Sequence, residues 1–167
     1  MTLKQYILHQ LREIRREMLI ALEGLSEEEL VAHEPEGRSP IAWIVEHCSA
    51  NLDFFIHRGI TGRLRGEHDR RFLAWPIIEP QPGDPYPPRE ELAARWTRVM
   101  DASLEAVESL PEEGLQEPSK SSRPPEPLVE SCLRVINHQN SHLRQIWCLL
   151  GWRRIAAKWP EQGQWLA

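Results

Sequence analysis

Apolar residues recur at three- and four-residue spacing in four segments, separated by stretches rich in polar residues, proline and glycine. The first segment runs from about Leu3 to Leu25 and carries a single apolar stripe, which predicts an amphipathic helix with one buried face. Ser26 then opens a short acidic turn, where its hydroxyl is expected to cap backbone N–H groups. The carboxylates that follow suit the positive end of a helix.

The second segment begins at Ser39 and Pro40 and continues to Gly59. A serine followed by proline is the usual pair of N-cap and first helical residue, so a helix is predicted to start here. Residues 61–88 are rich in proline, glycine and charge. Their length predicts a long crossover rather than a short hairpin, and we expect it to pack across the helices or against a partner.

The third segment follows Pro87 and Pro88 and ends near Leu110, and the fourth runs from Leu128 to Leu150. Gly151 is expected to close the last helix as a left-handed C-cap. There is no internal repeat and almost no alternating pattern typical of strands. The sequence therefore predicts an all-α fold, a four-helix bundle with the long crossover between its second and third helices.

Composition narrows the class of protein. A chain of 167 residues is long enough for one domain with a core, so residues 1–167 are predicted to form a single domain. A net charge of -5 argues against a nucleic-acid partner, which usually requires a basic face. The amino-terminal segment lacks the pattern of a signal peptide, and no apolar run reaches membrane-spanning length. A soluble, cytoplasmic protein without a membrane partner is expected.

Cysteine and tryptophan give weaker indications. Cys48, Cys132 and Cys148 are odd in number and lack CxxC spacing, which is typical of small buried thiols in a reducing compartment. Residues 152–167 carry three of the seven tryptophans, and we expect them to cover an end of the bundle or a subunit interface.

The candidate chemistry lies in three histidines. His138 and His142 are four residues apart on the apolar stripe of the fourth helix, so both imidazoles can reach one ion. His47 shares the inward stripe of the second helix with Ile44 and Asn51. Taken singly, a buried neutral histidine is more often a hydrogen-bonded core residue than a ligand. Three that converge in an apolar bundle are hard to satisfy without an ion, and three nitrogen ligands with an open position are typical of a catalytic metal site.

Neighbouring residues exclude two familiar metalloenzyme classes. Gln139 replaces the glutamate that follows the first histidine of the HExxH proteases, so the general base of that class is missing. The chain has no Glu-x-x-His pairs of the di-iron kind, which favours one metal over two. All-histidine ligation suits Zn, Ni, Fe or Cu and does not choose among them. Zn or Ni is taken as the first expectation.

These residues resemble the DinB/YfiT-like family of metal-dependent enzymes. The resemblance covers nearly the whole chain: four main helices, the long second connection, a histidine early in the second helix, and the run HQNSHLRQI from His138 to Ile146. It implies a metal triad of His47, His138 and His142 completed by water, and frequent homodimers. One departure is Arg144, at a position commonly occupied by glycine in the family. A bulky cation there is expected to narrow the pocket or to change its charge.

The resemblance implies a thiol-dependent S-transferase or a hydrolase that acts on a small electrophile, with a low-molecular-weight thiol as candidate cosubstrate. A metal can make hydroxide from bound water or hold a thiol as thiolate, and the family favours the second. Asn51 and Gln145, each about one turn from a ligand, are candidates to orient the rings or to bind substrate. No catalytic base is assigned. The alternative is a non-catalytic, metal-stabilised helical dimerisation module.

Overall fold

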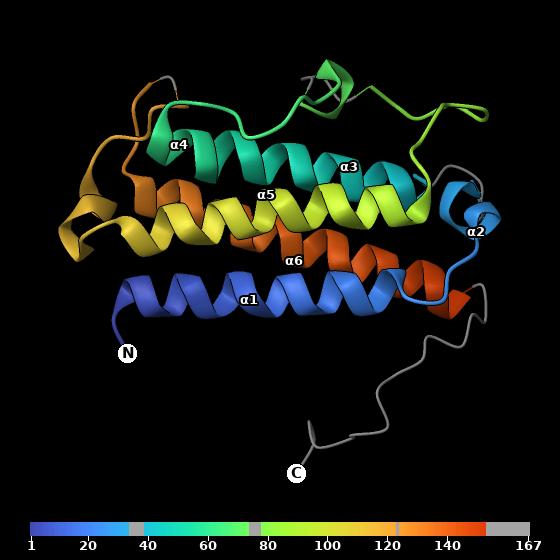
Figure 1. Cartoon of the computed structure of the whole chain (residues 1–167), viewed down its shortest axis with the longest axis horizontal. Coiled ribbons are helices and arrows are strands. Elements are labelled where there is room, and N and C mark those ends of the chain that lie inside the picture. Colours follow the sequence, from blue (N-terminus) through green and yellow to red (C-terminus); the bar gives the residue numbers. More distant parts are fainter. Residues whose placement is uncertain (34–38, 74–77, 123, 153–167) are drawn as a thin grey trace, which may run out of the picture.

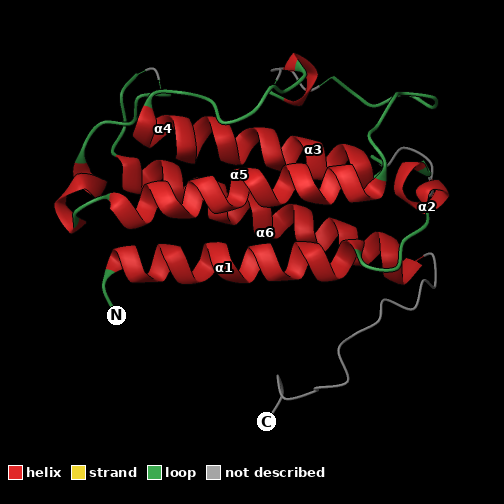
Figure 2. Ribbon diagram, in the orientation of Figure 1, coloured by secondary structure: helices red, strands yellow, loops and turns green. Residues whose placement is uncertain are grey.

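Long helices laid side by side make up most of the computed structural model, which describes residues 1–33, 39–73, 78–122 and 124–152 (Figure 1). Four helical stretches form the bundle: α1 (Leu3–Leu22), α3 (Ile41–Leu52) with its continuation, α5 (Arg89–Ser109) and α6 (Leu128–Trp152). The described ranges contain helices and connecting loops but no strand (Figure 2). The predicted all-α four-helix bundle is confirmed.

The order of the helices around the bundle explains the long connection. Contacts link α1 to α5, α5 to α3, α3 to α6 and α6 back to α1. Neighbours α3 and α5 run in the same direction, so the chain has to return along the bundle between them (Figure 1). Residues 62–88 make this return, and the predicted crossover is confirmed. It packs onto the helices at the short 3-10 helix η2 (Arg70–Phe72), where Phe72 is buried.

The first helix is shorter than predicted. A capping box of Thr2 and Gln5 starts α1, which ends at Leu22 rather than Leu25. Gly24 adopts a φ of +79°, a left-handed conformation that glycine tolerates best, and it turns the chain before Leu25. Ser26 caps α2 (Glu27–Val31), as predicted from the acidic turn.

The second helical stretch differs from the prediction at both ends. Pro40, not Ser39, is the N-cap of α3, and its backbone is extended, so the helix begins one residue later than expected. The stretch also continues past Gly59, through a π-helical turn η1 (Asp53–His57) and α4 (Arg58–Thr61), to a left-handed Gly62. Gly59 is needed for packing instead, because a Cβ there would lie 2.9 Å from the Ser119 hydroxyl.

The last two bundle helices follow the predicted boundaries closely. Pro88 precedes α5, and the linker after it contains a 3-10 helix, η3 (Glu112–Gln116), before α6 begins at Leu128. Gly151 lies inside α6, so the predicted C-cap there is wrong. The tryptophan-rich tail falls on residues 153–167, apart from Trp152, and lies outside the described residues.

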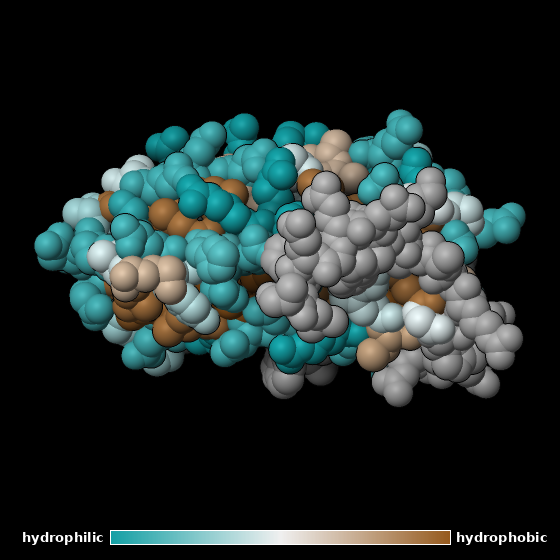
Figure 3. Space-filling view, turned by 90° about the horizontal axis from the view of Figure 1, so that it is seen from below, coloured by the Kyte–Doolittle hydropathy of each residue, from teal (hydrophilic) through white to brown (hydrophobic). Residues whose placement is uncertain are grey.

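The core fills the space between the four helical stretches. Large, fully buried side chains come from the first three of these stretches. They are Ile7, Leu11, Ile14 and Met18 in the first, Ile41, Leu52 and Ile56 in the second, and Leu92, Trp96 and Met100 in the third. On the face seen from below in Figure 3, hydrophilic residues cover most of the described surface, and hydrophobic ones appear in small patches. Cys48 and Cys132 are buried as expected, whereas Cys148 is exposed.

Within the part of the chain that the structure describes, none of the helices combines the length and the apolar character needed to cross a bilayer.

Candidate metal centre

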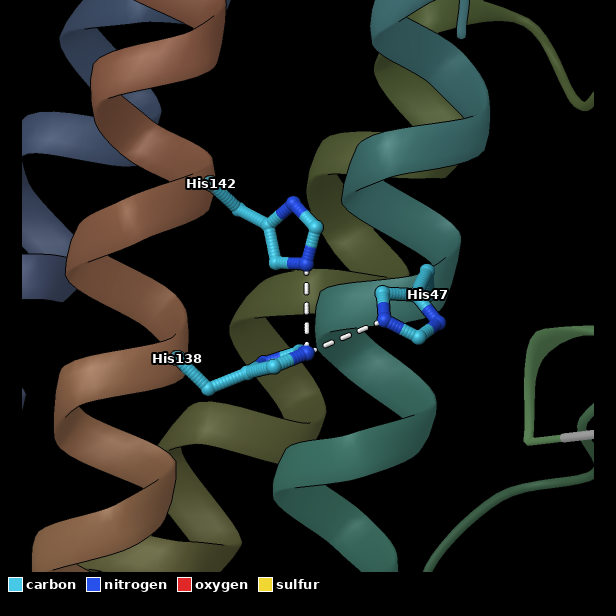
Figure 4. A group of neighbouring side chains, drawn as sticks. All are labelled: His47, His138 and His142. Carbon is cyan, nitrogen blue, oxygen red and sulfur yellow. Dashed lines mark hydrogen bonds between the residues drawn. The ribbon is translucent and has the colours of Figure 1, made fainter. Parts of the chain in front are cut away.

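Three imidazoles meet between α3 and α6. His138 and His142 lie one turn apart on α6 and face His47 on α3 (Figure 4). The Nε2 atom of His138 is 3.0 Å from Nε2 of His47 and 3.1 Å from Nε2 of His142. One nitrogen from each of the three residues lies within 4.8 Å of the other two. The sequence-predicted group is therefore brought together, close enough to hold one metal ion.

Hydrogen bonds at the opposite ring nitrogens define the protonation of two of these rings. The Nδ1–H of His47 donates to the backbone carbonyl of Phe72 at 2.7 Å. The Nδ1–H of His142 donates to the side-chain carbonyl of Gln145 at 2.7 Å. Because a neutral imidazole carries one proton, both Nε2 atoms then present lone pairs toward His138.

His138 can satisfy only one of these two lone pairs with a proton on its own Nε2. The Nε2 lone pair of the other histidine is then left without a proton donor. The Nδ1 atom of His138 is buried and has no hydrogen-bond partner among the described residues. A cation between the three Nε2 atoms removes this conflict, since each lone pair then has an acceptor.

The spacing also suits a metal. With Zn–N bonds of about 2.0–2.1 Å in tetrahedral geometry, ligand nitrogens are roughly 3.3 Å apart. The two distances of 3.0 and 3.1 Å in the cluster are close to this value. The donor set, all neutral nitrogen, fits the late transition metals such as Zn and Ni.

Burial keeps the cluster neutral. It lowers the pKa of His47 to about 4, against the hydrogen bond to Phe72 that raises it. Burial, together with the neighbouring rings of His142 and His47, lowers the pKa of His138 to about 3. The pKa of His142 is lowered by burial as well, while its bond to Gln145 raises it. At neutral pH all three rings are thus in the uncharged form that metal binding requires.

Aromatic and amide groups hold His47 in place. The ring of Trp43 stacks on that of His47, with centroids 4.8 Å apart and planes 15° from parallel. Phe72 packs edge-on against Trp43, so the crossover closes this side of the cluster. The Asn51 amide donates to the His47 carbonyl at 3.0 Å and lies 3.3 Å from Nδ1 of the ring. The candidate Asn51 therefore contacts His47.

Of the two candidates near His142, only Gln145 contacts it. Arg144 is exposed, and within the described part of the chain it makes no hydrogen bond or ion pair. Two residues along a helix correspond to about 200° of rotation, so Arg144 and His142 lie on different faces of α6. A narrowing of the pocket by Arg144 stays a prediction.

Two groups that sequence reasoning missed support the cluster. Gln139 is fully buried, and its side-chain amide donates to the carbonyl of Cys48 at 2.9 Å, which ties α6 to α3 beside His138. The place of Gln139 next to His138, a candidate ligand, was the available signal in the sequence. The Phe72 carbonyl belongs to the backbone, so its role cannot be predicted from residue type.

A buried carboxylate anchors the crossover on the π-helical turn η1, which continues α3. Asp53 is fully buried and accepts hydrogen bonds from the backbone N–H groups of Arg65 and Gly66 and from Nε2 of His68, at 2.8–2.9 Å. Burial raises the pKa of Asp53, but these hydrogen bonds outweigh it and the net pKa is lowered. The side chains of His68 and His57 both pack against Asp53 and are only 6% and 14% exposed.

The sequence model of the DinB superfamily matches residues 10–146, a range that contains all three histidines. No curated protein matches the chain.

Proposed function

The chain belongs to the DinB superfamily, and from this membership and the histidine cluster we propose that it is a metal-dependent enzyme. His47, His138 and His142 would hold one divalent transition metal, Zn or Ni first. The reaction proposed is transfer of a low-molecular-weight thiol to a small electrophile, with hydrolysis of such an electrophile as the second choice. The observation that carries the proposal is the pair of lone pairs directed at His138, which a cation satisfies and a single proton does not.

An ion held by three neutral imidazoles, when bound, lowers the pKa of a water or thiol at its remaining position. The residues of this chain prepare the site for that chemistry. Phe72 and Gln145 select the Nδ1–H tautomer of their histidines, so that Nε2 is free to ligate. Trp43 covers one face of His47 and excludes water from it.

The first test is elemental analysis of the untagged protein beside two histidine variants. We expect about one equivalent of a transition metal in the wild type. His142→Ala should lose it, since only two ligands remain, whereas the control His9→Ala should retain it because His9 lies exposed on α1. Protein that contains no metal and takes up neither Zn nor Ni would refute the metal centre.

The second test separates an enzyme from a non-catalytic helical module that merely retains an ion. Turnover of a thiol with a model electrophile is measured in the metal-loaded wild type and in His47→Ala, with circular dichroism and sedimentation as controls of fold and assembly. Loss of turnover in a folded variant with unchanged assembly supports the enzyme. A metal-loaded wild type without turnover of any thiol or electrophile, whose assembly fails in His47→Ala, supports the module. Homodimerisation is proposed on family grounds and is read from the same sedimentation data.

A further inference from the structure

A cavity lies on the other side of α3 from the histidines. It has a volume of about 410 Å³ and is enclosed by α3, by α5 and by residues 65–68 of the crossover. Glu46 and Ser49 line it from α3, in positions that turn away from the α6-facing residue His47. A cavity of this size is typical of pockets for small molecules.

Charged side chains line much of this cavity. Among the described residues its lining includes three arginines, Arg65, Arg95 and Arg98, and two glutamates, Glu46 and Glu67. Arg95 is already paired, at 3.3 Å with Glu46 and at 2.7 Å with Glu91 on its own helix.

The other two guanidinium groups have no such partner. Within the described part of the chain, neither Arg65 nor Arg98 forms an ion pair through its side chain. Both lie at the rim of the cavity, where each can reach a bound group. Guanidinium groups pair with carboxylates and phosphates in a planar, two-pronged geometry, which makes them the usual recognition elements for such anions.

Ser49 provides an independent indication. Its side chain lines the cavity and is 2% exposed, yet its hydroxyl has no hydrogen-bond partner among the described residues. A buried hydroxyl without a partner is unfavourable and is rare in folded proteins. A serine inside a helix ordinarily bonds to the carbonyl one turn before it, and this one does not.

We propose that this cavity binds a small molecule through an oxyanion, a phosphate or a carboxylate group. Arg98 and Arg65 neutralise the charge, and the Ser49 hydroxyl donates a hydrogen bond to one oxygen. The site is separate from the metal centre, so it does not depend on the function proposed above. Its volume of about 410 Å³ suits a small anionic molecule.

The test is a titration of the full-length, ¹⁵N-labelled protein with inorganic phosphate and, in a separate arm, with succinate. Chloride keeps the ionic strength constant. Saturable shifts of the Ser49 and Gly66 amides support the site, and the anion that binds more tightly identifies the head group. The absence of saturable shifts with both anions overturns the proposal, as do shifts centred on His138 and His142, which place the anion on the metal.

Three variants assign the contacts. Arg98→Gln and Ser49→Ala should each weaken binding about tenfold, the order expected for loss of one charge-assisted or buried hydrogen bond. Ser49→Ala should fold normally, because the hydroxyl it removes has no hydrogen-bond partner among the described residues. Arg63→Gln is the matched control, since it removes the same charge two residues from Arg65 but does not line the cavity. Equal weakening in all three variants means nonspecific attraction and overturns the proposal.

Discussion

Replacement of Asp53 by asparagine tests whether a single buried carboxylate holds the crossover on the bundle. One oxygen of Asp53 accepts from the Arg65 N–H at 2.8 Å, and the other accepts from Arg65, Gly66 and His68. Asparagine would place an N–H₂ group at one of these two positions. Whichever way the amide is turned, a donor then faces the N–H of Arg65 or Gly66, and no change of tautomer at His68 relieves it.

The loss has two parts: the hydrogen bonds accepted by a charged carboxylate become bonds to a neutral amide, and the amide N–H₂ group faces a backbone N–H, although Arg65 keeps its bond to Oδ2 when the nitrogen takes the Oδ1 position. Each of these is worth roughly 1.5–3 kcal/mol, and because they share one site we expect Asp53→Asn to cost about 3 kcal/mol in total. For a chain of this length that corresponds to a melting temperature lower by roughly 6–12 °C. Urea unfolding measures it directly as a lower midpoint at unchanged slope.

Asp101→Asn is the matched control. Asp101 pairs with Arg15 at 2.8 Å on the surface, where its side chain is 46% exposed, so its loss should cost less than about 1 kcal/mol. The two variants make the same chemical change and differ in burial. An Asp53→Asn protein within 1 kcal/mol of wild type would refute the reasoning. Since the folded-state pKa of Asp53 is lowered, the wild type should remain more stable to unfolding than Asp53→Asn above about pH 4. The difference in unfolding free energy should shrink as the pH falls further.

Three other changes have definite expectations. The lowered pKa values of His47 and His138, about 4 and about 3 in place of 6.5, predict that the metal-free protein keeps its stability above about pH 6.5. Its urea midpoint should fall as the pH drops toward 4, and a midpoint that stays constant from pH 7 to 5 would contradict this. Gly59→Ala should destabilise by about 1–3 kcal/mol, because its Cβ meets the Ser119 hydroxyl, whereas Gly151→Ala, with open space around it, should be neutral or stabilising in thermal melts. Gln145→Leu should weaken metal binding about 10–100-fold in a chelator competition, and an unchanged affinity would show that its bond to His142 is dispensable.

The bundle and the triad could be predicted from the sequence because both rest on helical periodicity. Apolar stripes determine which faces are buried, and the four-residue spacing of His138 and His142 places both rings on one face. The length of the second connection was sufficient to predict a crossover. These features depend on side-chain pattern alone.

The groups around the triad depend instead on contacts that no local pattern records. Phe72 acts through its carbonyl, and every residue has one. His68 reaches Asp53 only because the crossover folds back over a π-helical turn, and that turn has no propensity signal in the sequence. The helix ends at Pro40 and Gly62 were missed by one and three residues because several residues near each end can cap it.

The ring order of the helices also bears on how the protein assembles. The first histidine of the cluster, His47, comes from α3, and the other two come from α6, which lies 91 residues further along the chain at His138 and docks against both α1 and α3. A folding intermediate built from α1, α3 and α5 would offer only one imidazole of the cluster, and a single imidazole binds transition metals weakly. Capture of an ion would then be a late event, and in a refolding experiment the rate of metal uptake would time the docking of α6 rather than the collapse of the chain.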